Sequence, residues 1–161
     1  MEWADARVWR AVPGLHDVPP NGPLHDTLFH THLTQHAFLQ LWTGQQLKFP
    51  DPKDFKALGD LLAWVRTYYR DVAPFLGQLD EAQLRSPLPV QWARHFTERT
   101  GREPGATTLA ETLFQVTSHS TYHRGQANAR LRALGVEPPL VDYIAWIWLG
   151  RPRPEWPDLS S

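Results

Sequence analysis

Hydrophobic residues recur at every third or fourth position along three long stretches of the chain, which is the spacing of amphipathic helices. The first stretch runs from Leu24 to Thr43 and stops before Gly44, a residue type that readily adopts the left-handed conformation in which helices end. We therefore predict a first long helix here. Its apolar positions are Leu24, Leu28, Phe38, Leu39 and Trp42.

The second stretch follows the break FPDPKD and extends to about Leu79. Asp54 stands directly before it and can cap the helix, because its carboxylate accepts hydrogen bonds from the free N–H groups of a first turn. Pro74 lies near the far end, where we expect it to kink or shorten the helix. The expected buried stripe is Phe55, Leu58, Leu61, Leu62, Val65, Tyr68 and Val72.

The third stretch opens on a clear start signal. Thr108 is followed three residues later by Glu111, which is the spacing of a capping box. A helix is therefore predicted from here to about Leu134, ending at Gly135. The apolar stripe of this helix is Leu109, Leu113, Val116, Ala127, Leu131 and Leu134.

The segments around these helices are rich in proline and glycine. Residues 1–23 are expected to be a lead-in loop, and residues 151–161 a proline-rich tail. Residues 86–106 are expected to be a long loop, which in a compact domain more often has a function than none. Residues 141–149 predict a short helix after a proline turn. No alternating hydrophobic run predicts a strand, so the fold class is all-α, a helical bundle with its core over about residues 24–150.

Charge and hydropathy narrow the possible functions. The 161 residues suit one domain over residues 1–161, and 16 basic against 17 acidic side chains give a net charge of −1. Nucleic-acid binding is not expected, because no excess positive charge is present to neutralise phosphates. The chain has no apolar run of the roughly 18 residues that cross a membrane and no secretion signal at its N-terminus. We therefore expect a cytoplasmic protein without a membrane partner.

The chain contains no cysteine. This excludes disulfides, thiolate metal ligands and a cysteine nucleophile supplied by the protein. Any thiol chemistry must therefore use a thiol from another molecule.

Two histidines provide the first candidate site. His119 and His123 stand four residues apart on the third predicted helix, so both imidazoles project from one face, about one turn apart. Such a pair is a recurrent platform for two bonds to a zinc-like metal. Alternatively, the two residues are half-exposed surface histidines that bind no metal. A metalloprotease helix is excluded, because no glutamate follows the first histidine.

A third ligand would have to come from the first predicted helix. His30 and His32 flank opposite edges of its apolar stripe, and His36 is expected to point toward solvent. Three histidines on one ion leave a coordination position for water or substrate, as in catalytic zinc sites. The periodicity does not choose between His30 and His32, and a plain polar helix face is the alternative.

Three segments late in the chain carry residues in a distinctive order: HSTYHRGQ (119–126), LRALGVEPP (131–139) and Asp142-Tyr143. This order resembles the C-terminal signature of the DinB-like (damage-inducible, YfiT-related) family, over about residues 24–150. The step Leu28-Phe29-His30 is similar to the first-helix pattern of that family, which favours His30 over His32 as the third ligand.

The resemblance implies a four-helix bundle with a short C-terminal helix, often a homodimer, in which His30, His119 and His123 hold a divalent metal. Zinc is expected first, with nickel or iron as alternatives. Family members of known activity use low-molecular-weight thiols such as bacillithiol. The implied function is thus a thiol-dependent S-transferase, active in stress response, whose partners are a small thiol and an electrophile. Where many relatives carry a further histidine, this chain has Gln115.

Two other functions stay open. A metal-activated water could perform hydrolysis at the same histidines, or the protein could be a non-catalytic metal-binding stress protein. An open fourth coordination position favours an enzyme, and a position blocked by a side chain favours a structural metal. A di-iron bundle is excluded because Glu111 is followed three residues later by Phe114 instead of histidine.

Several neighbours of the histidine pair have two possible roles each. Arg124 or Arg130 could hold a carboxylate of the thiol, although Arg124 fits a surface position equally well. Gln126 could orient a ligand or serve a structural role. Tyr122 could donate a hydrogen bond or pack against a neighbouring helix.

Overall fold

The three stretches with helical periodicity form the longest helices of the computed structural model, α2 (Pro23–Trp42), α3 (Leu58–Gly77) and α6 (Leu109–Ala133). The structure describes residues 1–12 and 22–158. Across these residues there is no strand, only an isolated bridge between Pro87 and Thr108. The all-α prediction is therefore confirmed.

The predicted ends of two long helices are also confirmed. Thr108 Oγ1 accepts a hydrogen bond from the backbone N–H of Glu111 at 3.3 Å, and Glu111 Oε2 accepts one from the N–H of Thr108 at 2.7 Å. This is the capping box expected at the start of α6. Beyond the last turns of α2 and α6, Gly44 and Gly135 have φ angles of 65° and 79°, which lie in the left-handed region that glycine tolerates best.

The predicted cap of α3 was wrong. Asp54 lies in a short 3₁₀ turn, η1 (Pro52–Asp54), and its carboxylate accepts from the N–H of Asp51 at 3.0 Å. α3 begins later, where Asp60 Oδ2 accepts from the N–H of Ala57 at 3.2 Å. Pro74 lies inside the last turn of α3, three residues before the helix ends.

The expected loop over residues 1–23 requires a correction, because Glu2–Ala11 form a helix, α1. The prolines that suggested a loop all follow this segment, and α1 buries Trp3, Val8 and Trp9. A helix this short is marginal alone and depends on tertiary packing, here against α6. Residues 13–21 of the expected loop lie outside the described residues.

The expected loop over residues 86–106 also contains a helix, α5 (Arg94–Thr100), which follows the short α4 (Glu81–Arg85). α5 ends at Gly101, with φ 68°, and buries none of its residues. Its seven residues are too few to show a periodic stripe between flanking prolines and glycines. The short C-terminal helix predicted over residues 141–149 is confirmed as α7 (Tyr143–Trp148).

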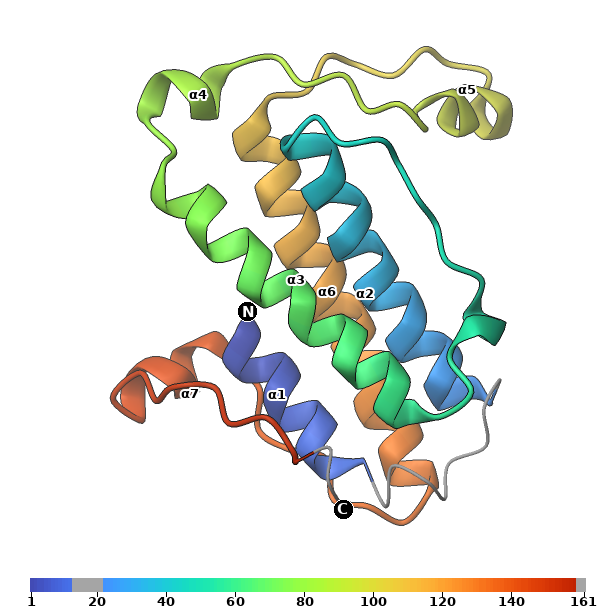
Figure 1. Ribbon diagram of the computed structural model, residues 1–161, viewed down its shortest axis with the longest axis vertical. Coiled ribbons are helices and arrows are strands. Elements are labelled where there is room, and N and C mark those ends of the chain that lie inside the picture. Colours follow the sequence, from blue (N-terminus) through green and yellow to red (C-terminus); the bar gives the residue numbers. More distant parts are fainter. Residues whose placement is uncertain (13–21, 159–161) are drawn as a thin grey trace.

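Helices α1, α2, α3 and α6 lie side by side and form a four-helix bundle (Figure 1). α2 is central, since it packs against both α6 and α3. The crossing segment, residues 86–107 with α5, follows α4 and crosses the end of the bundle where α2 ends and α6 begins (Figure 1). None of the described helices is long and apolar enough to span a membrane.

The apolar interior has two parts. The main core lies between the four helices of the bundle and includes Trp9, Leu58, Leu61, Leu62, Val65, Tyr68 and Leu131. The end cluster is smaller, built on buried Phe38, Leu41 and Val116, with Trp42, Leu88, Val90 and Trp92 packed against it. The main core sets the spacing of α2 and α6, and the end cluster attaches the crossing segment to the bundle.

Candidate metal centre

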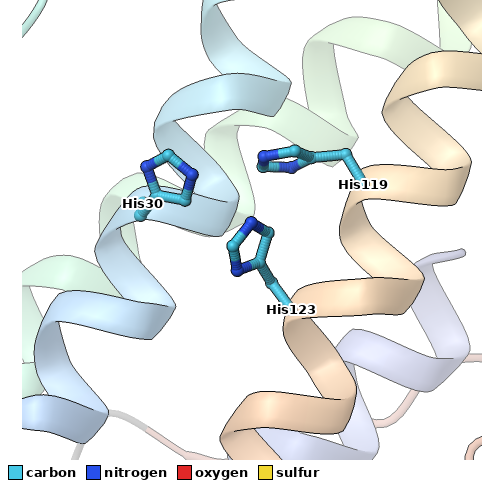
Figure 2. Close-up of side chains that lie close together, drawn as sticks. All are labelled: His30, His119 and His123. Atoms are coloured by element: carbon cyan, nitrogen blue, oxygen red, sulfur yellow. The ribbon is translucent and has the colours of Figure 1, made fainter.

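Three histidine side chains from two helices meet on one side of the bundle. His30 extends from α2, and His119 and His123 extend from adjacent turns of α6 (Figure 2). Each offers a ring nitrogen, and these three nitrogens lie within 4.8 Å of one another. The ring centroid of His30 is 5.1 Å from that of His119 and 4.6 Å from that of His123. The structure therefore brings together the three residues predicted as a set from the sequence.

The alternative third ligand, His32, is buried in the core away from this group. Its Nε2 accepts a hydrogen bond from the indole N–H of Trp9 at 3.0 Å, and its Nδ1 donates to Gln35 Oε1 at 2.8 Å. Both ring nitrogens are thus used within the protein. Of the two histidines that periodicity left open, only His30 joins the α6 pair.

The expectation that His36 points to solvent was wrong. Its ring is buried and stacks on Trp64 of α3, with centroids 4.0 Å apart and planes at 17°. Its Nε2 donates to the backbone carbonyl of Trp64 at 3.2 Å. A helical wheel places His36 opposite the main stripe, but α3 covers that face of α2.

The electrostatic surroundings keep two of the three imidazoles neutral. Burial, together with the nearby rings of His123 and His30, lowers the pKa of His119 to about 4. Partial desolvation and the nearby ring of His123 likewise lower the pKa of His30 below its ordinary value. At neutral pH each of these rings therefore keeps a free lone pair, which is the form that binds a metal.

The tautomer of His123 is set by Gln126, whose Oε1 accepts from Nδ1 of His123 at 2.8 Å. The hydrogen bond leaves Nε2 of that ring as the atom with a free lone pair. A partner of this kind is typical of the residues that orient metal-bound histidines. The orienting role considered for Gln126 thus fits the observed contact.

Other neighbours differ from their expected roles. Arg124 is not a surface residue: it is buried, and its guanidinium contacts Asp5 and Thr121 at 2.8 and 2.7 Å. It is therefore not free to hold a substrate carboxylate. Arg130 donates to Thr27 Oγ1 at 2.6 Å. The ring of Tyr122 is exposed and meets that of His123 edge-on, with centroids 5.0 Å apart.

The donor set fits a divalent metal ion. Imidazole nitrogen suits zinc, nickel, copper or iron, and three such ligands leave a tetrahedral ion one open position. Nδ1 of His119 is buried and has no hydrogen-bond partner within the described part of the chain. A buried polar atom without a partner is uncommon in folded proteins, and coordination at this ring would explain its orientation.

The group borders a cleft of about 1260 Å³, whose wall includes His119 and, one turn earlier on α6, Gln115. Among the residues that the structure describes, the histidine group contains no carboxylate and no fourth protein ligand. His30 is exposed, and the other two rings are half-buried. The group is therefore accessible to small molecules.

The family model described as the DinB family matches residues 17–155, which is most of the chain and includes all three histidines. No curated protein matches the chain.

Proposed function

Because the chain belongs to the DinB family, we propose that His30, His119 and His123 hold one divalent cation, zinc in the first place, and that the protein is a thiol-dependent S-transferase. The thiol is a low-molecular-weight compound such as bacillithiol, and the acceptor is a small electrophile. The observation that carries this proposal is the convergence of three imidazoles, with nitrogens within 4.8 Å, beside an accessible cleft.

The proposed reaction joins the sulfur of the thiol to an electrophilic carbon. The thiol proton passes to solvent, the S–C bond forms, and the leaving group departs with its bonding electron pair. A bound divalent cation lowers the pKa of a coordinating thiol and so supplies the thiolate near neutral pH.

The residues of this chain hold and arrange the reactants. His30 and His119 are neutral ligands because of their lowered pKa values, and Gln126 fixes the ring of His123. Neutral ligands leave the positive charge of the cation uncompensated. His119 also forms part of the cleft wall, so a molecule in the cleft lies next to the histidine group.

The two alternatives have less support. A general base next to the activated water speeds hydrolysis, and the described residues place no carboxylate in the histidine group. A purely structural metal would have its fourth position filled by the protein, whereas this group contains three ligands and lies beside a cleft. The accessible arrangement favours a reactive site.

The protein is further proposed to be a homodimer of the cytoplasm that acts in stress response. Four large apolar side chains on α6 and α7 are 66–78% exposed: Phe114, Tyr122, Tyr143 and Trp148. Contact with a second copy would bury such side chains. Light scattering on the purified protein tests this, since a monomer at all concentrations would contradict the dimer.

The experiment for the main proposal combines elemental analysis with a thiol-transfer assay. Purified protein is expected to contain one equivalent of divalent metal and to accelerate reaction of bacillithiol or glutathione with chlorodinitrobenzene. The variant His119→Ala should lose both the metal and the acceleration. Metal-loaded protein that accelerates none of the thiols tested would contradict the transferase proposal.

A matched control separates loss of the site from loss of any histidine. His95 is exposed and is paired with Glu98 at 2.9 Å, outside the histidine group. The variant His95→Ala should therefore keep one equivalent of metal. If it loses the metal as His119→Ala does, the ligand assignment is wrong.

A further inference from the structure

The cleft beside the histidine group has an aromatic wall. Its lining residues come from the crossing segment, residues 86–107, and from α2 and α6. Figure 1 shows this segment passing over the ends of both helices. Phe38, Trp92 and Phe96 line the cleft, together with His119. Pockets that hold organic ligands are mostly apolar and contain a few polar groups that orient the ligand.

Two rings of this wall pack on each other without a ligand. The ring of Trp92 meets that of Phe38 edge-on, with centroids 4.9 Å apart and planes at 83°. The crossing segment is closed by backbone hydrogen bonds from Leu88 N–H to the Thr107 carbonyl at 2.7 Å and from Leu109 N–H to the Ser86 carbonyl at 3.0 Å. An aromatic surface held in this way loses little conformational entropy when a flat ligand packs on it.

Among the described residues, one cation that lines the cleft has no ion-pair partner. Glu111 is engaged by the capping box with Thr108, and His95 is paired with Glu98. Arg99 also lines the cleft, is exposed, and makes no ion pair with any residue in 1–12 or 22–158. A guanidinium offers a planar fork of donors that matches a carboxylate or sulfonate.

We propose that this cleft binds a small aromatic anion, with its ring against Trp92, Phe38 and Phe96 and its acidic group on Arg99. The inference rests on the proposed function in one respect: such a molecule would be the electrophile, placed beside His119. The aromatic side chains favour a ligand with a flat ring, and the guanidinium of Arg99 favours a ligand with a negative charge.

The test uses anilinonaphthalene sulfonate, an aromatic anion that fluoresces when it leaves water, and its uncharged relative phenylnaphthylamine. The wild-type protein is expected to bind one equivalent of the anion saturably. Trp92→Ala should weaken binding of both probes by about tenfold, since it removes an aromatic partner. Arg99→Gln should weaken only the anion, by about threefold to tenfold.

Two controls separate this cleft from other apolar surface. Trp148 is 78% exposed and lies on α7, outside the cleft, so Trp148→Ala should leave both affinities unchanged. Phe96 is 47% exposed and outside both parts of the apolar interior, so Phe96→Ala can be made without disturbing the core. It should weaken both probes even if Trp92→Ala fails to fold.

The outcomes distinguish the cleft from the metal site. Binding should persist in protein stripped of metal, because Trp92, Phe96 and Arg99 are not ligands. Binding that survives Phe96→Ala but is lost in Trp148→Ala would overturn the cleft proposal and leave the metal proposal intact. Saturable binding at this cleft in a protein that never takes up metal would overturn the metal proposal and leave the cleft proposal intact. Equal weakening of both probes by Arg99→Gln would overturn the anionic part.

Discussion

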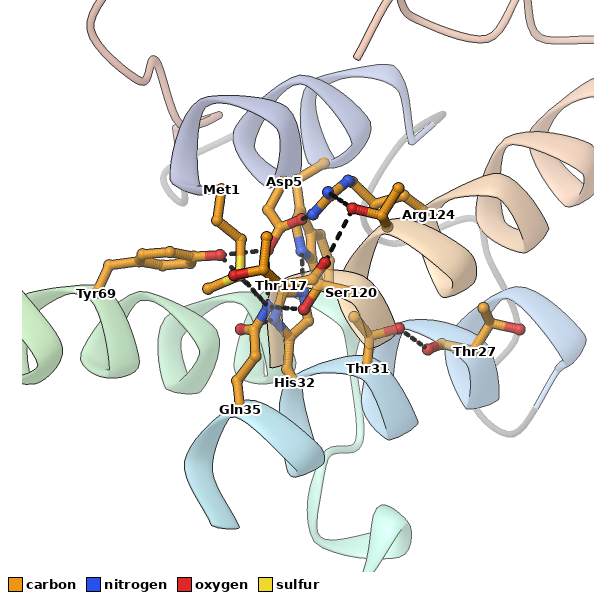
Figure 3. Close-up of polar contacts among 12 residues, drawn as sticks. Met1, Asp5, Thr27, Thr31, His32, Gln35, Tyr69, Thr117, Ser120 and Arg124 are labelled. Atoms are coloured by element: carbon orange, nitrogen blue, oxygen red, sulfur yellow. Dashed lines mark hydrogen bonds and ion pairs between the residues drawn. The ribbon is translucent and has the colours of Figure 1, made fainter. Parts of the chain in front are cut away.

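The carboxylate of Asp5 in α1 and the guanidinium of Arg124 in α6 form a buried ion pair at 2.8 Å, although 119 residues separate them in the sequence. The second oxygen of Asp5 accepts from Gln35 Nε2 at 2.9 Å and from the hydroxyl of Tyr69 (Figure 3). Gln35 also donates to Ser120 Oγ at 3.0 Å. The pair thus belongs to a buried polar network that joins all four helices of the bundle.

This network fixes how α6 is rotated about its own axis at the turns that carry the histidine pair. Ser120 follows His119 in the chain, and Arg124 follows His123. Because neighbouring residues on a helix project about 100° apart, holding the face with Ser120 and Arg124 also aims the adjacent face with His119 and His123. The buried contacts therefore determine where the α6 pair meets His30.

Loss of the ion pair should strongly destabilise the fold. Asp5→Ala leaves the guanidinium of Arg124 buried without its countercharge, which costs about 3–5 kcal/mol. Urea unfolding measures this difference in the free energy of unfolding. Glu81→Ala, which removes the exposed pair between Glu81 and Arg85, serves as the control and should change stability by less than about 0.5 kcal/mol. Similar values for the two variants would contradict the role assigned to the buried pair.

His36 should make stability depend on pH. Burial, with a contribution from His32, lowers the pKa of His36 from 6.5 to about 4. The unfolded chain therefore takes up a proton at this residue before the folded chain does, so stability is full above pH 6.5 and falls as the pH drops toward about 4. His36→Phe keeps a ring to stack on Trp64 but cannot titrate. Its free energy of unfolding should fall less than that of the wild type over the same range, and parallel curves would contradict the prediction.

The two candidate third ligands should behave differently on substitution. His30→Ala and His123→Ala should each abolish stoichiometric metal and leave the helical circular dichroism mostly unchanged. His32→Ala should retain the metal but destabilise the protein by about 1–3 kcal/mol, since it leaves two buried groups without a partner, the indole N–H of Trp9 and the Oε1 of Gln35. Metal analysis and thermal unfolding of the three variants test this. Loss of metal only in His32→Ala would reverse the assignment.

Gln126 should affect affinity for the metal more than its stoichiometry. Removing its hydrogen bond to His123 with Gln126→Ala is expected to weaken metal binding by about 10–100-fold. Gln115 is a matched control on the same helix, because it makes no hydrogen bond to the described histidines. Competition with a coloured chelator gives both affinities. Equal affinity in the wild type and Gln126→Ala would show that the ring of His123 needs no partner.

The sequence predicts the long helices well because their signals are local. The capping box of Thr108 and Glu111 and the apolar stripes act within a few turns, so they can be recognised without knowledge of the rest of the fold. The α1 helix was missed because its stability comes from contacts such as Asp5 with Arg124, far away in the chain. The pattern within the ten residues of α1 does not predict that this helix packs against α6.

The candidate site, too, was predictable only as far as its signals are local. The spacing of His119 and His123 places both on one face of α6, and family resemblance favours His30. What excludes His32 is the indole of Trp9, which belongs to the helix that the sequence did not reveal. Likewise, the cleft depends on how the crossing segment packs against Phe38, a contact between parts of the chain that no local pattern connects.

The division of the apolar interior into two parts has a consequence for the exchange of backbone amide protons with solvent. The crossing segment is held by the small end cluster and a few backbone hydrogen bonds, whereas α2 and α6 are also held by the main core and the buried polar network. Regions with fewer buried contacts open at a lower free energy than the whole domain. Amide protons of residues 86–107 should therefore exchange with deuterium well before those in the middle of α2 and α6, so molecules can enter and leave the cleft while the three histidines keep their positions.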